Sequence, residues 1–109
     1  MASPQLHPSK LAADFSNDFV PLWNKLSDFP PISEGPQLRT AVQQLTIKVR
    51  DDLSANNALT PERDAMLIGI PEDLSESEAA ANAGQYIQMN TALQRALGRI
   101  NNVMVDLLA

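Results

Sequence analysis

The chain has 109 residues, with 8 Lys and Arg against 13 Asp and Glu, a net charge of −5 and no cysteine. This length fits one compact domain, and the missing cysteines exclude a disulfide scaffold, thiolate metal sites and a cysteine nucleophile. The acidic balance argues against nucleic-acid binding, because phosphates are neutralised mainly by Lys and Arg.

Residues 1–8 include Pro4 and Pro8 and offer little to bury, which predicts a flexible N-terminal arm before a single α-helical domain over residues 9–109. A helix over residues 9–26, capped by Ser9, is predicted from apolar residues at steps of three and four. These residues are Leu11, Phe15, Phe19, Leu22 and Leu26. Pro21 removes one backbone donor inside this helix, so we expect a kink or a break into two pieces near Phe19.

Two further helices are expected after a stiff connector around Pro30 and Pro31. Residues 36–53 carry a second apolar stripe, made of Leu38, Val42, Leu45, Val49 and Leu53. A short helix over residues 61–68 is indicated by Thr60 as its cap, and Gly69 and Pro71 are expected to end it. Residues 66–70 could instead form a buried strand, but the sequence offers no alternating partner strand, which favours the helix.

The last segment predicts one long helix. Ser75 and Glu78 match a capping box, with Ser77 as the competing cap. From Ala79 a heptad seam runs nearly to the chain end through Ala83, Tyr86, Asn90, Leu93, Leu97, Ile100, Met104 and Leu107. Such a helix would have about 30 residues and a length of about 45 Å, with Gly84 and Gly98 as points where it can bend. The predicted fold is therefore all-α, a bundle of four helices around a long C-terminal helix, or five if Pro21 splits the first.

The apolar stripe of this last helix is wider than a two-stranded coiled coil needs, because Met89, Ala96 and Val103 form an adjoining row. Between residues 79 and 105 the only charged residues are Arg95 and Arg99. The pattern is typical of the central helix of a bundle or of a subunit interface. The predicted interface consists of Tyr86, Met89, Asn90, Leu93, Ala96, Leu97, Ile100, Val103, Met104 and Leu107.

Two features admit a functional interpretation beside a structural one. Asn90 could fix register or oligomeric state, orient a small ligand, or simply bond to water or to Tyr86. The aromatic residues of the first helix either anchor the core or line a pocket for a lipid-like ligand. The candidate pocket consists of Phe15, Phe19, Trp23, Tyr86 and Asn90.

No pattern for catalysis or for a cofactor is found in the sequence. His7 is the only histidine and lies in the predicted arm, which argues against a triad or a multi-histidine metal site. Asp14 and Asp18 share a helix face with Lys10, as in a solvated ion pair. The acidic run over residues 72–78 lacks an EF-hand pattern and fits helix capping, although it could also meet a basic partner. We therefore expect no catalytic, cofactor-binding or metal-binding residues.

A secretory signal and a lipidation motif are not evident at the N-terminus, where Ala2 excludes myristoylation. The longest strongly apolar stretch, residues 65–70, is far shorter than the roughly 20 residues that span a bilayer. These observations predict an intracellular, cytoplasmic protein with no membrane span.

The function favoured by the sequence is a non-catalytic interaction or assembly protein that forms homo-oligomers through its C-terminal helix, with a further protein partner as an open alternative. The competing function is a carrier of a small apolar ligand, with its pocket between the aromatic first helix and the last helix. An enzyme ranks third, because no pair of carboxylates is convincingly placed inward.

Overall fold

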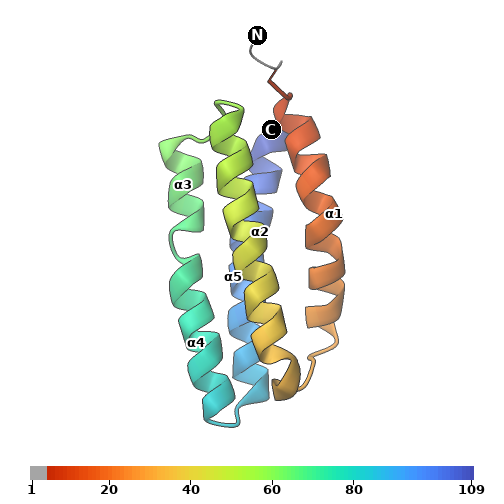
Figure 1. The fold of residues 1–109 in the computed structure, drawn as a ribbon, viewed down its shortest axis with the longest axis vertical. Helices are drawn as coiled ribbons and strands as arrows, with labels where there is room; N and C mark the ends of the chain where they lie inside the picture. The colour runs from red at the N-terminus through yellow and green to blue at the C-terminus, as the bar shows by residue number, and fades with distance from the viewer. Residues whose placement is uncertain (1–4) are drawn as a thin grey trace.

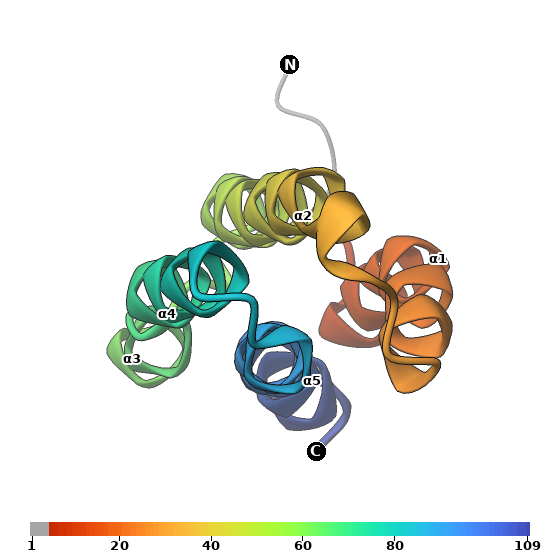
Figure 2. The same cartoon turned by 90° about the horizontal axis from the view of Figure 1, so that it is seen from below.

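The computed structural model describes residues 5–109, and within them every regular element is helical. The elements are α1 (Pro8–Ser27), the short 3-10 helix η1 (Ile32–Glu34), α2 (Gly35–Ala55), α3 (Pro61–Leu67), α4 (Ile70–Asn82) and α5 (Tyr86–Leu108). Helices α3 and α4 follow each other end to end and occupy one corner of the bundle, while α1, α2 and α5 occupy the other three (Figures 1 and 2). The predicted all-α four-helix bundle is therefore confirmed, with extents of 51 × 26 × 23 Å.

Helix α1 runs without interruption through Pro21, so the predicted break near Phe19 is wrong. Pro21 is exposed, and the carbonyl that lacks its amide partner can bond to water instead of being stranded in the core. The cap also differs from the prediction, because the imidazole Nδ1 of His7 accepts the Ser9 N–H at 3.1 Å. Of the predicted arm, residues 1–4 lie outside the described part of the chain.

Helices α2 and α3 match the sequence pattern closely. The five stripe residues of α2 are all buried. The hydroxyl of Thr60 accepts the Arg63 N–H at 3.1 Å, so Thr60 caps α3 as predicted. Residues 66–70, for which a strand was the alternative, form the end of α3, a turn and the start of α4. Pro71 therefore lies in the first turn of a new helix, where its missing N–H costs nothing.

The prediction of one long helix over residues 79–107 is wrong, because the chain reverses between α4 and α5. Gly84 has φ +74°, a left-handed conformation that glycine adopts without strain. The Gly84 N–H donates to the Ala81 carbonyl at 3.0 Å, and the Gln85 N–H donates to the Ala80 carbonyl at 2.9 Å. This pair of bonds is a Schellman motif, which ends α4. Ser75 and Glu78, the predicted capping box, consequently lie inside α4.

Helix α5 lies at the centre of the packing, because α1, α2, α3 and α4 all contact it. Its buried residues join those of α1 and α2 in one hydrophobic core. The apolar row predicted to widen the stripe is fully buried, with Met89, Ala96 and Val103 all without exposed surface. The width of the stripe thus reflects neighbours on several sides, as a central helix requires.

Replacing Gly84 should test whether its backbone conformation sets this reversal. We expect Gly84→Ala to lower the free energy of unfolding by about 1–2 kcal/mol, because an L side chain is strained at this φ. A Cβ at Gly84 would meet nothing within 4 Å, so the loss would come from the backbone and not from a clash. Gly84→Asn should lose less, since Asn tolerates the left-handed region. Equal losses in urea denaturation would contradict this explanation.

Candidate interaction surface

The predicted interface lies mostly in the core of a single chain. Its buried members are Met89, Asn90, Leu93, Ala96, Leu97, Ile100, Val103 and Leu107. Met104 is partly buried against the same core, and Tyr86 is exposed. The seam is covered within the chain because the turn at Gly84 folds α4 back along α5. A second chain can therefore bind only outside this seam, unless the bundle opens. Self-association through α5 remains a prediction.

The candidate ligand pocket does not form as one site. The Nε2 amide of Gln94 donates to the Leu26 carbonyl at 3.0 Å, which sets the register between the antiparallel helices α1 and α5. At a rise of about 1.5 Å per residue, Phe15 lies about 16 Å from this bond toward one end of the bundle, and Tyr86 lies about 12 Å from it toward the other end. The two residues are therefore too far apart to line one small pocket. Phe15 is fully buried, and Trp23 stacks on Phe19 with ring centroids 5.9 Å apart.

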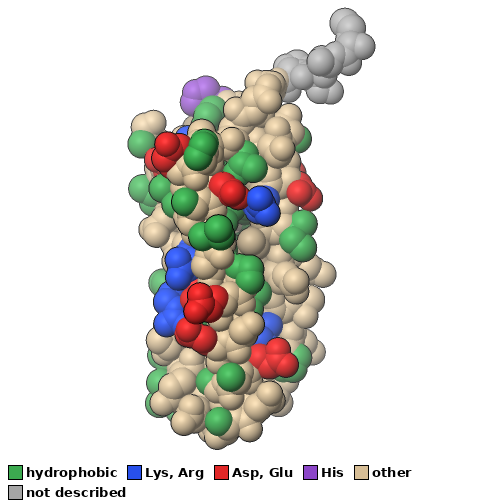
Figure 3. Space-filling model, turned by 90° about the vertical axis from the view of Figure 1, so that its left-hand side faces the viewer, with side chains coloured by type: hydrophobic (Ala, Val, Ile, Leu, Met, Phe, Trp, Pro, Cys, Tyr) green, Lys and Arg blue, Asp and Glu red, His purple; other side chains and the backbone are tan. Residues whose placement is uncertain are grey.

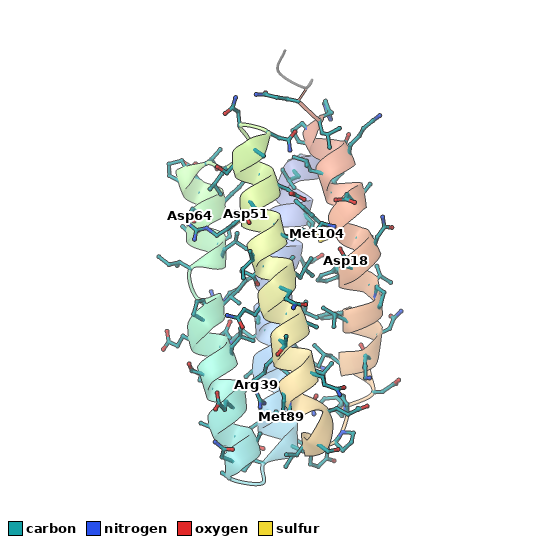
Figure 4. All side chains as sticks on the ribbon, in the orientation of Figure 1. Asp18, Arg39, Asp51, Asp64, Met89 and Met104 are labelled. Carbon is teal, nitrogen blue, oxygen red and sulfur yellow. The ribbon has the colours of Figure 1, made fainter. Side chains whose placement is uncertain are left out.

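Five grooves are described on the outside of the bundle, and none of these five is lined by a residue of the candidate pocket. The largest has a volume of about 560 Å³ and lies between α2 and α4. Its lining residues are Pro36, Arg39, Thr40, Gln43, Pro71, Leu74, Ser75 and Glu78. Arg39 extends from this groove toward Met89 of α5 near the α4–α5 turn (Figure 4). The groove is wide and mixed in polarity, unlike an enclosed apolar ligand site.

Asn90 holds the connector between α1 and α2. Its side chain has no exposed surface, and its Nδ2 amide donates to the Pro30 carbonyl at 2.9 Å and to the Tyr86 carbonyl at 2.8 Å. Phe29, just before Pro30, has φ +50°, a strained conformation for an aromatic residue. Of the three interpretations of Asn90, the structure contains the hydrogen bond to Tyr86. Asn90 is buried in the core, however, and it also bonds to the connector through Pro30.

The acidic run is largely paired within the chain. The Asp73 carboxylate is buried and accepts from Arg95 Nε at 2.7 Å and from Arg99 Nε at 2.6 Å. Arg95 also pairs with the exposed Glu76. The hydrogen bond to Asp73 is the main reason that the pKa of the Arg95 guanidinium is raised above its ordinary value. Both arginines thus bind α4, and acidic and basic side chains lie side by side on this flank (Figure 3).

The junction between α3 and α4 depends on the same cluster. A Cβ at Gly69 would overlap the Arg99 guanidinium, so only a glycine lets this group lie across the backbone there. Farther along α5, Asp106 pairs with Arg63 of α3 at 2.8 Å. Arg95, Arg99 and Asp106 are the charged residues of α5, and all three are directed toward α3 or α4.

The charged side chains of α1 that form ion pairs lie on the side of the helix that faces α2, away from α5. Lys48 of α2 lies 3.3 Å from the Asp14 carboxylate and 2.8 Å from that of Asp18, which Figure 4 shows on the edge of α1 nearest α2. The hydrogen bond to Asp18 raises the pKa of the Lys48 ammonium above its ordinary value of 10.5. Lys25 pairs with Glu34, just before α2. Asp14 thus pairs with Lys48 across the two helices, where the sequence indicated Lys10.

The outer edge where α1 and α5 meet is consequently uncharged. We call it the α1–α5 face. Helix α5 contributes Ile87, Thr91, Gly98, Asn102, Val105 and Leu108, and α1 contributes Val20, Trp23 and Ser27. All of these α5 residues except Leu108 lie between Gln94, which bonds to α1, and Arg95, which bonds to α4, and so they point away from the bundle. Leu108, in the last turn, lies on the α1 side of Gln94. Val105 is 58% exposed, Leu108 65% and Trp23 42%. Sequence reasoning missed this face because it assigned the apolar seam to the interface.

Metal sites and membrane-spanning helices are not found in the described part of the chain. Within residues 5–109 no group of three or more His, Cys, Asp or Glu side chains is placed to hold a metal ion. Among the same residues, no helix combines the length and the apolar character needed to cross a bilayer. Comparison with protein families, with curated proteins and with solved structures gives no match. Function has to be inferred from the residues themselves.

Asn90→Leu should destabilise the protein. The substitution removes the donor that satisfies the Pro30 carbonyl in a buried site, which typically costs about 1–3 kcal/mol. Unfolding in urea measures the change, and a gain in stability would show that the connector does not need this bond.

Asp73→Asn should also lower the free energy of unfolding, by about 1–3 kcal/mol, because it weakens two charge-assisted hydrogen bonds at a buried carboxylate. Glu76→Gln is the matched control, since Glu76 is exposed and shares Arg95 with Asp73. An exposed ion pair contributes about 0–1 kcal/mol, so the control should change stability little. Equal effects in the two variants would contradict the structural role of Asp73.

Proposed function

We propose that this protein is a non-catalytic assembly protein that self-associates through its C-terminal helix, with the α1–α5 face of one copy packed on that of a second. The observation that supports this proposal is an outward face of α5 without charge along its whole length, in a chain of net charge −5. Solvent-exposed helix faces normally carry charged residues. An uncharged face with exposed apolar side chains is typical of a surface that another protein covers.

A second copy suits this face better than a charged partner would. The acidic residues of the chain lie mainly in α3, α4 and the α2 side of α1, so two copies can bring their α1–α5 faces together without opposing like charges. A strongly basic or acidic partner would form no ion pair with the α1–α5 face. Trp23 supplies an exposed aromatic side chain of the kind that contributes most to interface energies.

The face is also large enough. The 23 residues of α5 span about 35 Å, and two adjacent helices are about 20 Å wide. Contact over this area would bury about 700 Å² on each copy, or about 1,400 Å² in total. Specific protein interfaces bury about 1,200–2,000 Å². The area of the face therefore falls within the range of a specific dimer.

The alternative proposal is the carrier of a small apolar ligand between α1 and α5. It predicts a monomer that retains a ligand through purification. Native mass spectrometry distinguishes the two, because a dimer has twice the mass of the 11.9 kDa chain, whereas a loaded carrier shows the chain mass plus that of a small molecule.

A charge placed on the face should separate the copies. Ile87 and Ile47 are each 52% exposed, and Ile47 lies on α2, outside the face. We expect Ile87→Asp to weaken the dimer at least about tenfold, because a carboxylate would be buried without a partner. An aspartate suits the first turn of α5, so the helix itself should remain stable.

Ile47→Asp is the matched control and should leave the dimer unchanged. Light scattering at tens of micromolar protein, with dilution to find the dissociation constant, measures both variants. A wild-type protein at the monomer mass under these conditions would overturn the proposed function. So would equal weakening by the two substitutions.

A further inference from the structure

We infer that the two copies pair α5 against α5 in antiparallel orientation, about a two-fold axis that passes close to Gly98. This inference rests on the proposed self-association and specifies its geometry. In an isologous pair each residue meets the residue placed symmetrically about the axis. The outward residues of α5 therefore have to complement each other when the helix is reversed about Gly98.

They do complement each other. Reversal about Gly98 places Thr91 opposite Val105 of the second copy, seven residues away on either side. Ile87 at the start of α5 comes opposite Ala109 at the chain end, eleven residues from Gly98 on either side. The exposed side chains of Val105 and Ile87 would thus be covered by Thr91 and Ala109 of the second copy. Nearer the axis, the uncharged polar residues Gln94 and Asn102 would face each other.

Gly98 gives the helices room to approach at the axis. It lies inside α5, where a glycine lowers helix stability relative to alanine, and the packing of its own chain does not require it. A Cβ built at Gly98 would meet nothing within 4 Å, so the space beside it is open. A second helix can therefore approach the α5 backbone more closely here than at any larger residue.

Trp23 lies at the same level of the bundle. Counted from the bond between Gln94 and the Leu26 carbonyl, Trp23 is beside residues 97 and 98 of α5. Its indole stacks on Phe19 with an interplanar angle of 13°, which holds it in place at the margin of the face. The exposed part of the indole is thus positioned to flank the crossing point of the two helices.

The antiparallel orientation is also favoured by the helix dipoles. In a parallel pair the negative C-terminal ends of the two helices would lie together, and so would the positive N-terminal ends. In the antiparallel pair each end of α5 lies beside the opposite end of its partner. This electrostatic preference adds to the match of the side chains.

Cysteine cross-linking can test the geometry, because the natural chain has no cysteine. Single variants Thr91→Cys and Val105→Cys are prepared as full-length chains, mixed and oxidised. In the inferred dimer the two different cysteines lie opposite each other, whereas two copies of Thr91→Cys would hold their thiols about 21 Å apart along the axis. A disulfide requires Cα atoms about 4.4–6.8 Å apart. The mixture should therefore form the covalent dimer at least about tenfold faster than either variant alone.

Ile47→Cys, exposed on α2, is the matched control and should form only the slow background of random collision. Fluorescence of Trp23, the single tryptophan, gives an independent readout. Its emission should shift to longer wavelength when the dimer is diluted to monomer. Gly98→Phe should weaken the dimer at least about tenfold, because a large side chain at the crossing point separates the helices.

The outcomes separate the two proposals. A monomer by light scattering overturns the proposed function and this inference together. A dimer in which Thr91→Cys alone cross-links fastest overturns only the antiparallel pairing, and so does a dimer that tolerates Gly98→Phe. A dimer that cross-links fastest in the mixture supports both.

Discussion

The left-handed backbone at Gly84 is the constraint on which the rest of the bundle depends. It ends α4 through two hydrogen bonds and turns α5 back along it, so that the long apolar seam is folded onto its own chain. Each of the other α-helices then packs against α5. A straight helix through this point would be about 45 Å long, whereas α1 and α2 span about 30 Å each, so part of the seam would have no neighbours.

The polar residues of α5 take part in holding the bundle together. Asn90 and Gln94 bind backbone carbonyls at the end of α1 and in the connector, while Arg95 and Arg99 bind the buried Asp73. These side chains are thus directed sideways, toward α1 on one flank and α4 on the other. What remains facing outward between them is uncharged. The α1–α5 face is therefore a by-product of the same contacts that position the neighbouring helices.

Much of this fold can be predicted from the sequence, because local signals and apolar spacing agree in α2 and α3. The break before α5 was missed because the heptad steps continue unchanged across Gly84, so spacing alone cannot show the reversal. Pro71 and the acids beside it mark a helix start at least as well as Ser75 does, and the sequence does not rank them. The α1–α5 face depends on which flank of α5 meets α1, and that is decided by long-range contacts such as the one between Gln94 and Leu26.

The packing of α1 against α5 brings the helices from the two ends of the described chain together along one side of the bundle (Figure 1). Roughly 80 residues separate the middles of these helices, and closing a loop of that size costs about 4 kcal/mol in chain entropy. The α1–α5 face, proposed to bind the second copy, lies along this same side. Association would therefore reinforce the contact that a single chain forms at the greatest entropic cost. The stability of the fold would then rise with the protein's own concentration, as it does for any ligand that binds only the native state.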